Sequence, residues 1–276
     1  RSERAGQICE GDASVRAGFQ EVDALLALGR RDEALARARA LWDRAGGSGD
    51  APLGASASRR VIEASRQTGD LSSIVGVVER ASRMGDGAIA SNIMRRAYDT
   101  ARDAVERSGT VFLVDVSVVD LDDARAVLAR VGEWAESVGE GRLRAACDER
   151  RASACVLSGD AEAARSIVSA LIERGGATAD RLRIRAEALI AQGDDAGAFA
   201  SLRVITRGTS ARTSTSEHFW YAWARMLEIL ARRNEDGGRT GVIRREITRL
   251  RATEGYGLCG ECAARIDRVA RSVGLE

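Results

Sequence analysis

Cys259 and Cys262, in the segment LCGEC, have the spacing most directly suited to chemistry. Two cysteines separated by two residues can form a redox couple, a local disulfide or half of a zinc site, and a helix start beside them favours the thiolate. No second CxxC and no CxxH follows to complete a zinc set. The five cysteines of the chain are an odd number, so at least one stays unpaired within it. We therefore expect ordinary reduced thiols, with a local disulfide or a share in a metal site as alternatives.

Four of the eleven aromatic residues fall within five positions, at Phe219, Trp220, Tyr221 and Trp223. On a helix these rings cover two adjoining faces. Such a wide apolar arc indicates burial on both flanks, so we expect a core between helices. The alternative is a peptide groove or dimer face anchored by Trp220 or Tyr221. The only histidine, His218, has no partner adjacent in sequence and is a poor candidate for catalysis.

All 42 basic residues other than that histidine are arginines, which a coding bias toward Ala, Arg and Gly explains better than selection for anion binding. The run from Arg232 to Arg251 carries seven arginines against three carboxylates. This excess could bind phosphates, with Arg244, Arg245 and Arg249 as the candidate anion site. Most such runs are the solvated face of a helix. A nucleic-acid partner is therefore not expected.

The sequence lacks the motifs of the common catalytic sites. It has no glycine-rich phosphate loop, no HExxH, no GxSxG and no clear spacing of a nucleophile and a base. Its many carboxylates single out no pair for acid–base chemistry. We expect a protein that is not an enzyme, with no catalytic residue and no cofactor.

Composition indicates a folded helical protein. Of its 276 residues, 45% are hydrophobic and 30% charged, and Pro52 is the only proline. The net charge of +1 gives no general attraction to nucleic acid or to an anionic membrane. No apolar run approaches the roughly 18 residues that a membrane span needs. We expect no membrane span and a cytoplasmic location.

An internal repeat organises the segment from Ala152 to Gly208. A shift of 34 residues superimposes small, turn and apolar positions of one copy on those of the next: Ala152 on Ala186, Gly159-Asp160 on Gly193-Asp194, Ala164 on Ala198, Val168 on Leu202 and Leu171 on Ile205. Glycine accepts the left-handed backbone that ends a helix, aspartate caps the next helix, and alanine lets two helix axes approach. A helix-turn-helix unit of this length resembles the tetratricopeptide (TPR) repeat.

The resemblance implies an all-α fold in which antiparallel helix pairs stack into an α-solenoid. We expect degenerate helix pairs over residues 1–140, two clear repeats over 141–208 and capping helices over 209–276. Residues 46–58 contain four glycines and Pro52, which indicates a flexible loop. The middle is irregular: the alternating valines of 110–119 suit a strand, but a lone strand lacks a partner, so we favour a helical or irregular connector over 108–120.

In TPR-like solenoids the first helix of each pair lines the concave surface. The resemblance therefore implies that arginines on such helices could receive an acidic peptide; these are Arg144, Arg151, Arg181 and Arg185. The leading hypothesis is a non-enzymatic scaffold that holds a partner protein or peptide, and self-association is a further option. Alternatives are a nucleic-acid- or anion-binding repeat, and the regulatory or assembly portion of a larger enzyme, because the chain begins at Arg1 rather than methionine.

Overall fold

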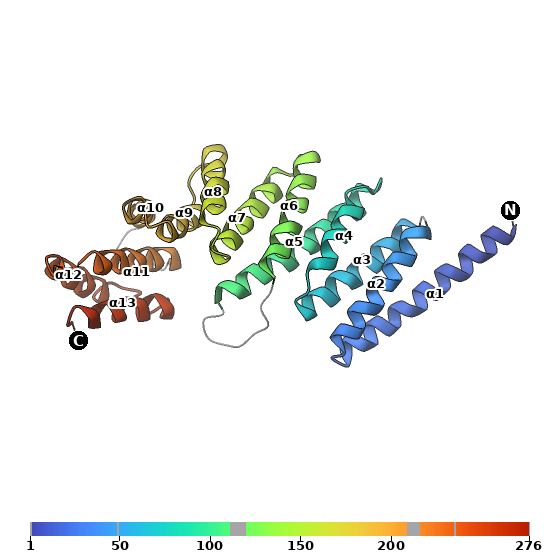
Figure 1. Cartoon of the computed structure of the whole chain (residues 1–276), viewed down its shortest axis with the longest axis horizontal. Coiled ribbons are helices and arrows are strands. Elements are labelled where there is room, and N and C mark those ends of the chain that lie inside the picture. The colour runs from blue at the N-terminus through green and yellow to red at the C-terminus, as the bar shows by residue number, and fades with distance from the viewer. Residues whose placement is uncertain (1, 49, 111–119, 209–215, 235, 276) are drawn as a thin grey trace. The chain divides into compact units, whose positions relative to one another are not determined.

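The computed structural model describes residues 2–48, 50–110, 120–208, 216–234 and 236–275. All regular secondary structure within these ranges is helical, as the sequence predicts (Figure 1). The chain forms two compact units, unit 1 from Arg1 to Ser158 and unit 2 from Gly159 to Glu276. The connector expected at 110–119 lies almost wholly outside the described residues, which resume at Asp120.

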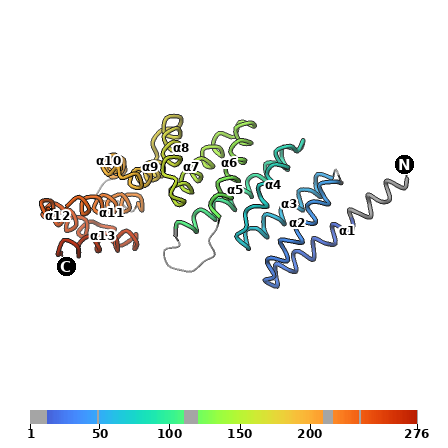
Figure 2. Tube along the Cα trace, viewed as in Figure 1, coloured from blue at the N-terminus to red at the C-terminus, as the bar shows by residue number. Residues whose placement is uncertain are grey.

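Unit 1 is an ordered succession of helix pairs. Its described helices are α1 (Ser2–Ala27), α2 (Arg31–Ser48), α3 (Ala51–Thr68), α4 (Ser72–Ala81), α5 (Gly87–Thr110), α6 (Leu121–Ser137) and α7 (Gly141–Leu157). Each helix packs on the next in sequence, and the odd-numbered helices also pack on one another, α1 on α3, α3 on α5 and α5 on α7. The trace of unit 1 in Figure 2 follows this order. Packing between sequential neighbours is the arrangement of an α-solenoid.

One continuous apolar core holds unit 1 together. It contains fully buried side chains from successive helices, among them Val22, Leu41, Val61, Ile93 and Leu128. A single helix pair has too little apolar surface to bury by itself, so each pair completes the core of its neighbour. The helix pairs of unit 1 therefore share one continuous core.

The prediction of a flexible loop at residues 46–58 is wrong, because most of this stretch belongs to the end of α2 and the start of α3. Asp50 is the N-cap of α3 and accepts a hydrogen bond from Leu53 N at 3.0 Å. Pro52 lies in the first helical turn, where a missing N–H does no harm. Gly46 lies in α2, where a Cβ would come within 2.2 Å of the Arg80 guanidinium in its present position. The glycines at 46, 47 and 54 therefore lie within helices, and only Gly46 has a close side-chain neighbour.

Unit 2 continues the helix pairs with six described helices. They are α8 (Ala161–Gly175), α9 (Ala179–Ala191), α10 (Asp195–Arg207), α11 (Glu217–Arg232), α12 (Thr240–Arg251) and α13 (Gly260–Ser272). Helix α11 supplies residues to two apolar clusters. Met226 packs with α9 and α10, whereas Trp220 packs with α12 and α13. The wide apolar arc expected on this helix is confirmed as a core element with two buried faces.

The Gly-Asp turns have the geometry that the repeat predicts. Gly193 has a φ of 78°, and Asp194 caps α10 by accepting a hydrogen bond from Gly197 N at 2.8 Å. Ala198, one turn further on, is fully buried. The earlier copy matches it in all three respects: Gly159 has a φ of 81°, Asp160 accepts from Ala163 N, and Ala164 is fully buried. The boundary between the units falls just before Gly159, inside the block expected at 141–208.

Candidate partner-binding surface

Arg144 and Arg151, two of the arginines expected to meet a partner, neutralise a buried carboxylate in unit 1. Asp148 is only 3% exposed. Its oxygens lie 3.0 Å from Arg144 Nε and 3.1 Å from Arg151 Nη1, and Arg144 also reaches Glu136 at 2.6 Å. Both guanidinium groups are thus occupied within α6 and α7, although their side chains keep partial solvent exposure.

Arg181 and Arg185 lie on α9 in unit 2 and differ from each other. Arg181 is buried, and its Nη1 donates to the carbonyl oxygens of Leu171 at 3.3 Å and Gly176 at 2.9 Å. These carbonyls belong to the end of α8, which Arg181 therefore caps. Arg185 is exposed and forms no ion pair with any residue that the structure describes. The four candidate arginines are divided between the units, and three of them serve the fold.

The aromatic candidates lie inside unit 2. Trp220 is 2% exposed and meets the ring of Tyr256 edge-on, with 5.7 Å between ring centroids. Tyr221 is half-buried, its hydroxyl donates to Glu187, and the Arg183 guanidinium stacks over its ring at 4.3 Å. Burial, with the Glu187 carboxylate beside it, raises the pKa of Tyr221 well above its usual range. These side chains form a core and its polar edge, and the indole of Trp220 is not displayed for a partner.

The C-terminal arginines do not gather into an anion site. Arg244 donates to the carbonyl oxygens of Val273 at 2.8 Å and Gly274 at 3.2 Å, where α13 ends. Arg249 pairs with Glu246 and lies over the ring of Trp223. Arg245 is exposed and has no ion pair with the described part of the chain. Nothing in this arrangement converges on one phosphate.

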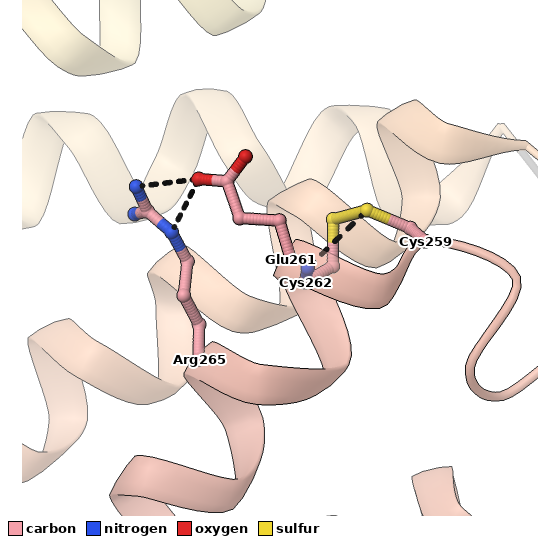
Figure 3. Close-up of a disulfide and its surroundings, with 4 residues drawn as sticks. All are labelled: Cys259, Glu261, Cys262 and Arg265. Atoms are coloured by element: carbon pink, nitrogen blue, oxygen red, sulfur yellow. Dashed lines mark hydrogen bonds and ion pairs between the residues drawn. A yellow bond between two sulfur atoms is a disulfide. The ribbon is translucent and has the colours of Figure 1, made fainter. Parts of the chain in front are cut away.

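The cysteine pair departs from the expectation of reduced thiols. Cys259 and Cys262 are joined by a disulfide at the start of α13 (Figure 3). Within the described residues no group of three or more His, Cys, Asp and Glu side chains could hold a metal ion. Of the alternatives that the sequence left open, the structure contains the local disulfide.

An open cleft of about 620 Å³ lies in unit 1, away from all of the residues that the sequence singled out. Its lining comes from the start of α2 and from the C-terminal ends of α3 and α5: Arg31, Arg66, Gln67, Asp103, Glu106 and Arg107. Helices α3 and α5 are neighbours in the odd-numbered row, which corresponds to the first helices of the pairs. Five of the six lining residues thus come from odd-numbered helices, and Arg31 comes from α2.

The carboxylates of the cleft are neutralised by arginines that do not line it. Asp103 accepts from Arg102 at 2.9 Å, and Glu106 lies 3.2 Å from Arg150.

Among the lining arginines, Arg66 pairs with Glu63 at 2.9 Å. Arg107 donates to the backbone oxygen of Asp103 at 3.2 Å. Arg31 is exposed and has no ion pair with any described residue. The lining itself contains three arginines and two carboxylates. The lining therefore has a formal excess of one positive charge.

Sequence reasoning missed this cleft, although one signal marks it. Arg66 and Arg107 occupy the last turns of α3 and α5, where a cation complements the negative end of the helix dipole. Arginines in the last turns of two successive odd-numbered helices would have singled out this end of the row. With 42 basic residues in the chain, the pattern does not stand out by composition.

No helix in the described part of the chain combines the length and the apolar character needed to cross a membrane. No protein-family model matches the sequence, and no curated protein matches it either. The resemblance to TPR repeats consequently rests on the 34-residue spacing, the Gly-Asp turns and the sequential packing of helices.

Proposed function

We propose that this protein is a non-enzymatic, TPR-like scaffold whose unit 1 cleft holds an acidic segment of a partner protein. The observation that carries the proposal is the arginine-lined cleft between the ends of α3 and α5, next to the start of α2. Guanidinium groups bind carboxylates through paired, charge-assisted hydrogen bonds, so an extended Asp- or Glu-rich segment is the complementary ligand.

The charges of the cleft favour selectivity for an acidic peptide more than high affinity for it. Its own acids are already paired with Arg102 and Arg150, and Arg66 is paired with Glu63, so an incoming carboxylate has Arg31 as its main partner. The Gln67 amide nitrogen donates to Glu63 at 2.9 Å, and its second N–H can donate to a peptide carbonyl. Partly exposed ion pairs of this kind raise the association rate and fix the alignment of the bound peptide more than they raise its affinity.

Selection from a displayed library of random twelve-residue peptides on the full chain tests the proposal. The expected result is enrichment of peptides with several Asp or Glu residues. A counter-selection uses Arg31→Glu combined with Arg66→Gln. Glutamate at position 31 begins α2, where a negative charge favours the helix, so this change leaves the fold intact.

The matched control is Arg83→Glu, since Arg83 is an exposed arginine of unit 1 outside the cleft. The enriched peptides should lose binding to the cleft variant and keep binding to the control. A selection that enriches no acidic sequence, or one whose winners bind all three proteins equally, contradicts the proposal.

A further inference from the structure

The Cys259–Cys262 disulfide occupies the first turn of α13 and is independent of the cleft. Cys259 is the N-cap residue, and its Sγ accepts a hydrogen bond from Cys262 N at 3.3 Å. Figure 3 shows the disulfide at this helix start, with the Glu261 carboxylate turned toward Arg265. The positive end of the helix dipole and this N–H both stabilise negative charge on the Cys259 sulfur.

The two cysteines differ in their exposure, although both pack on the same apolar cluster. Cys262 is 4% exposed and belongs to the apolar cluster of α11, α12 and α13. Cys259 is only half-buried, and Leu258 beside it is 66% exposed. An external sulfur can therefore approach Cys259, whereas Cys262 is shielded. The exposed leucine gives an approaching chain an apolar contact next to the reactive atom.

The disulfide closes a very short loop, and the packing of α13 does not depend on it. Only two residues separate the cysteines, so the cross-link restricts the unfolded chain far less than a bridge between distant segments. Helix α13 is held by Ile266, Val269 and Ala270, all buried against α11 and α12. Opening the disulfide leaves these contacts in place, so the pair can change its redox state while unit 2 stays folded.

We propose that Cys259 and Cys262 form a thiol–disulfide exchange site that reacts with a dithiol. One thiolate of the dithiol attacks Cys259 Sγ, a mixed disulfide forms, and Cys262 leaves as a thiolate that takes up a proton. The second thiol of the same dithiol then attacks the reductant sulfur that is bonded to Cys259, and Cys259 leaves as a thiolate. Two electrons pass to the protein, the dithiol becomes a cyclic disulfide, and the reaction runs in reverse with an external disulfide.

The first experiment incubates the oxidised full chain with dithiothreitol, alkylates it under native conditions and locates the added groups by mass spectrometry. The expected product carries an alkyl group on Cys259 that the unreduced chain lacks, whereas the shielded Cys262 and the buried Cys147 and Cys155 react far more slowly. Oxidised glutathione should restore the disulfide, and the helical circular dichroism should be unchanged throughout. Loss of helical signal on reduction would make the bridge a structural staple and overturn the proposal, as would failure of the disulfide to re-form.

The second experiment compares Cys262→Ser with Cys259→Ser. In the first variant the accessible thiol of Cys259 should form a mixed disulfide with oxidised glutathione at least about tenfold faster than Cys262 does in the second. Equal rates would contradict the assignment of Cys259 as the attacking and attacked sulfur. The wild-type measurement decides the question if either variant fails to fold.

Discussion

Arg144 pairs with Asp148 across one turn of α7, with 3.0 Å between Nε and Oδ2. Asp148 is buried, and Arg151 contacts its other oxygen from the opposite direction along the helix. Two of the arginines predicted to bind a partner thus stabilise the buried carboxylate of Asp148 in unit 1. An arginine-rich sequence allows this use of the side chain as readily as it allows binding.

This relationship predicts unequal effects of its removal. Replacing both Arg144 and Arg151 by alanine leaves a buried carboxylate without either arginine and should lower the free energy of unfolding by about 3 kcal/mol or more. Asp148→Ala leaves two partly exposed guanidinium groups that water can solvate, so its cost should be about 1–2 kcal/mol. Urea unfolding of both variants measures the difference. A larger loss for Asp148→Ala would contradict this account of the pair.

Tyr221 predicts a difference between two tyrosine hydroxyls in unit 2. Its hydroxyl donates to Glu187, whose carboxylate is also paired with Arg225 and is only 21% exposed. Tyr221→Phe should lower the free energy of unfolding by about 1.5–3 kcal/mol, as for hydrogen bonds to charged groups. Tyr256→Phe removes a hydroxyl from the more exposed Asp267 and should cost under about 1 kcal/mol. Thermal unfolding that ranks the two variants in the opposite order would refute this reading.

Cys147 predicts a loss of stability at alkaline pH. Burial, with a smaller contribution from Asp148, raises the pKa of this thiol from 9.0 to about 12. Below pH 9 the thiol is protonated in both states and has no effect. Between pH 9 and 12 the unfolded chain loses the proton while the folded chain keeps it, so stability falls as pH rises.

The expected size of the effect is about 1 kcal/mol between pH 9 and pH 10. Urea unfolding of Cys147→Ala and of its parent at both pH values isolates the contribution as a difference of differences. Both proteins should carry Cys259→Ala and Cys262→Ala so that no thiolate can attack the disulfide. Parallel pH profiles for the two proteins would show that Cys147 does not hold its proton in the folded state.

The N-cap hydrogen bond of Asp194 in the repeat turn is expected to stabilise the fold. Its side chain accepts from Gly197 N at the start of α10, so Asp194→Ala should lower the free energy of unfolding by about 1 kcal/mol. Asp236, an exposed aspartate of the same unit, provides the control and should change stability by less than about 0.5 kcal/mol on replacement by alanine. Equal effects of the two substitutions on stability would contradict a stabilising role for the Asp194 cap.

The helix pairs could be predicted where their signals are local. The Gly193-Asp194 turn needs only a left-handed residue followed by a capping side chain, and both can be read from the sequence. The glycines of 46–58 were misleading, because those at 46, 47 and 54 lie in α2 and α3, and Gly46 packs beside Arg80 of another helix. A glycine chosen for distant packing has the same appearance in a sequence as a glycine chosen for flexibility.

The candidate site depends mainly on contacts between residues that are distant in the sequence. Arg181 was expected to meet a partner, yet the carbonyl oxygens at the end of α8 draw it inside. Arg31 and Arg66 lie 35 positions apart on different helices and meet at one cleft only when α2 and α3 have packed. Distinguishing a structural arginine from a binding one requires the positions of its neighbours.

The most direct test of the scaffold proposal is a fluorescence anisotropy titration of an enriched acidic peptide against three proteins: the wild type, Arg31→Glu with Arg66→Gln, and Arg83→Glu. We predict that the cleft variant binds about tenfold more weakly or worse, a loss of at least about 1.4 kcal/mol, while the control stays within about twofold of the wild type. Equal affinities for all three proteins, or a loss confined to the Arg83 variant, would contradict the assignment of the unit 1 cleft as the binding site.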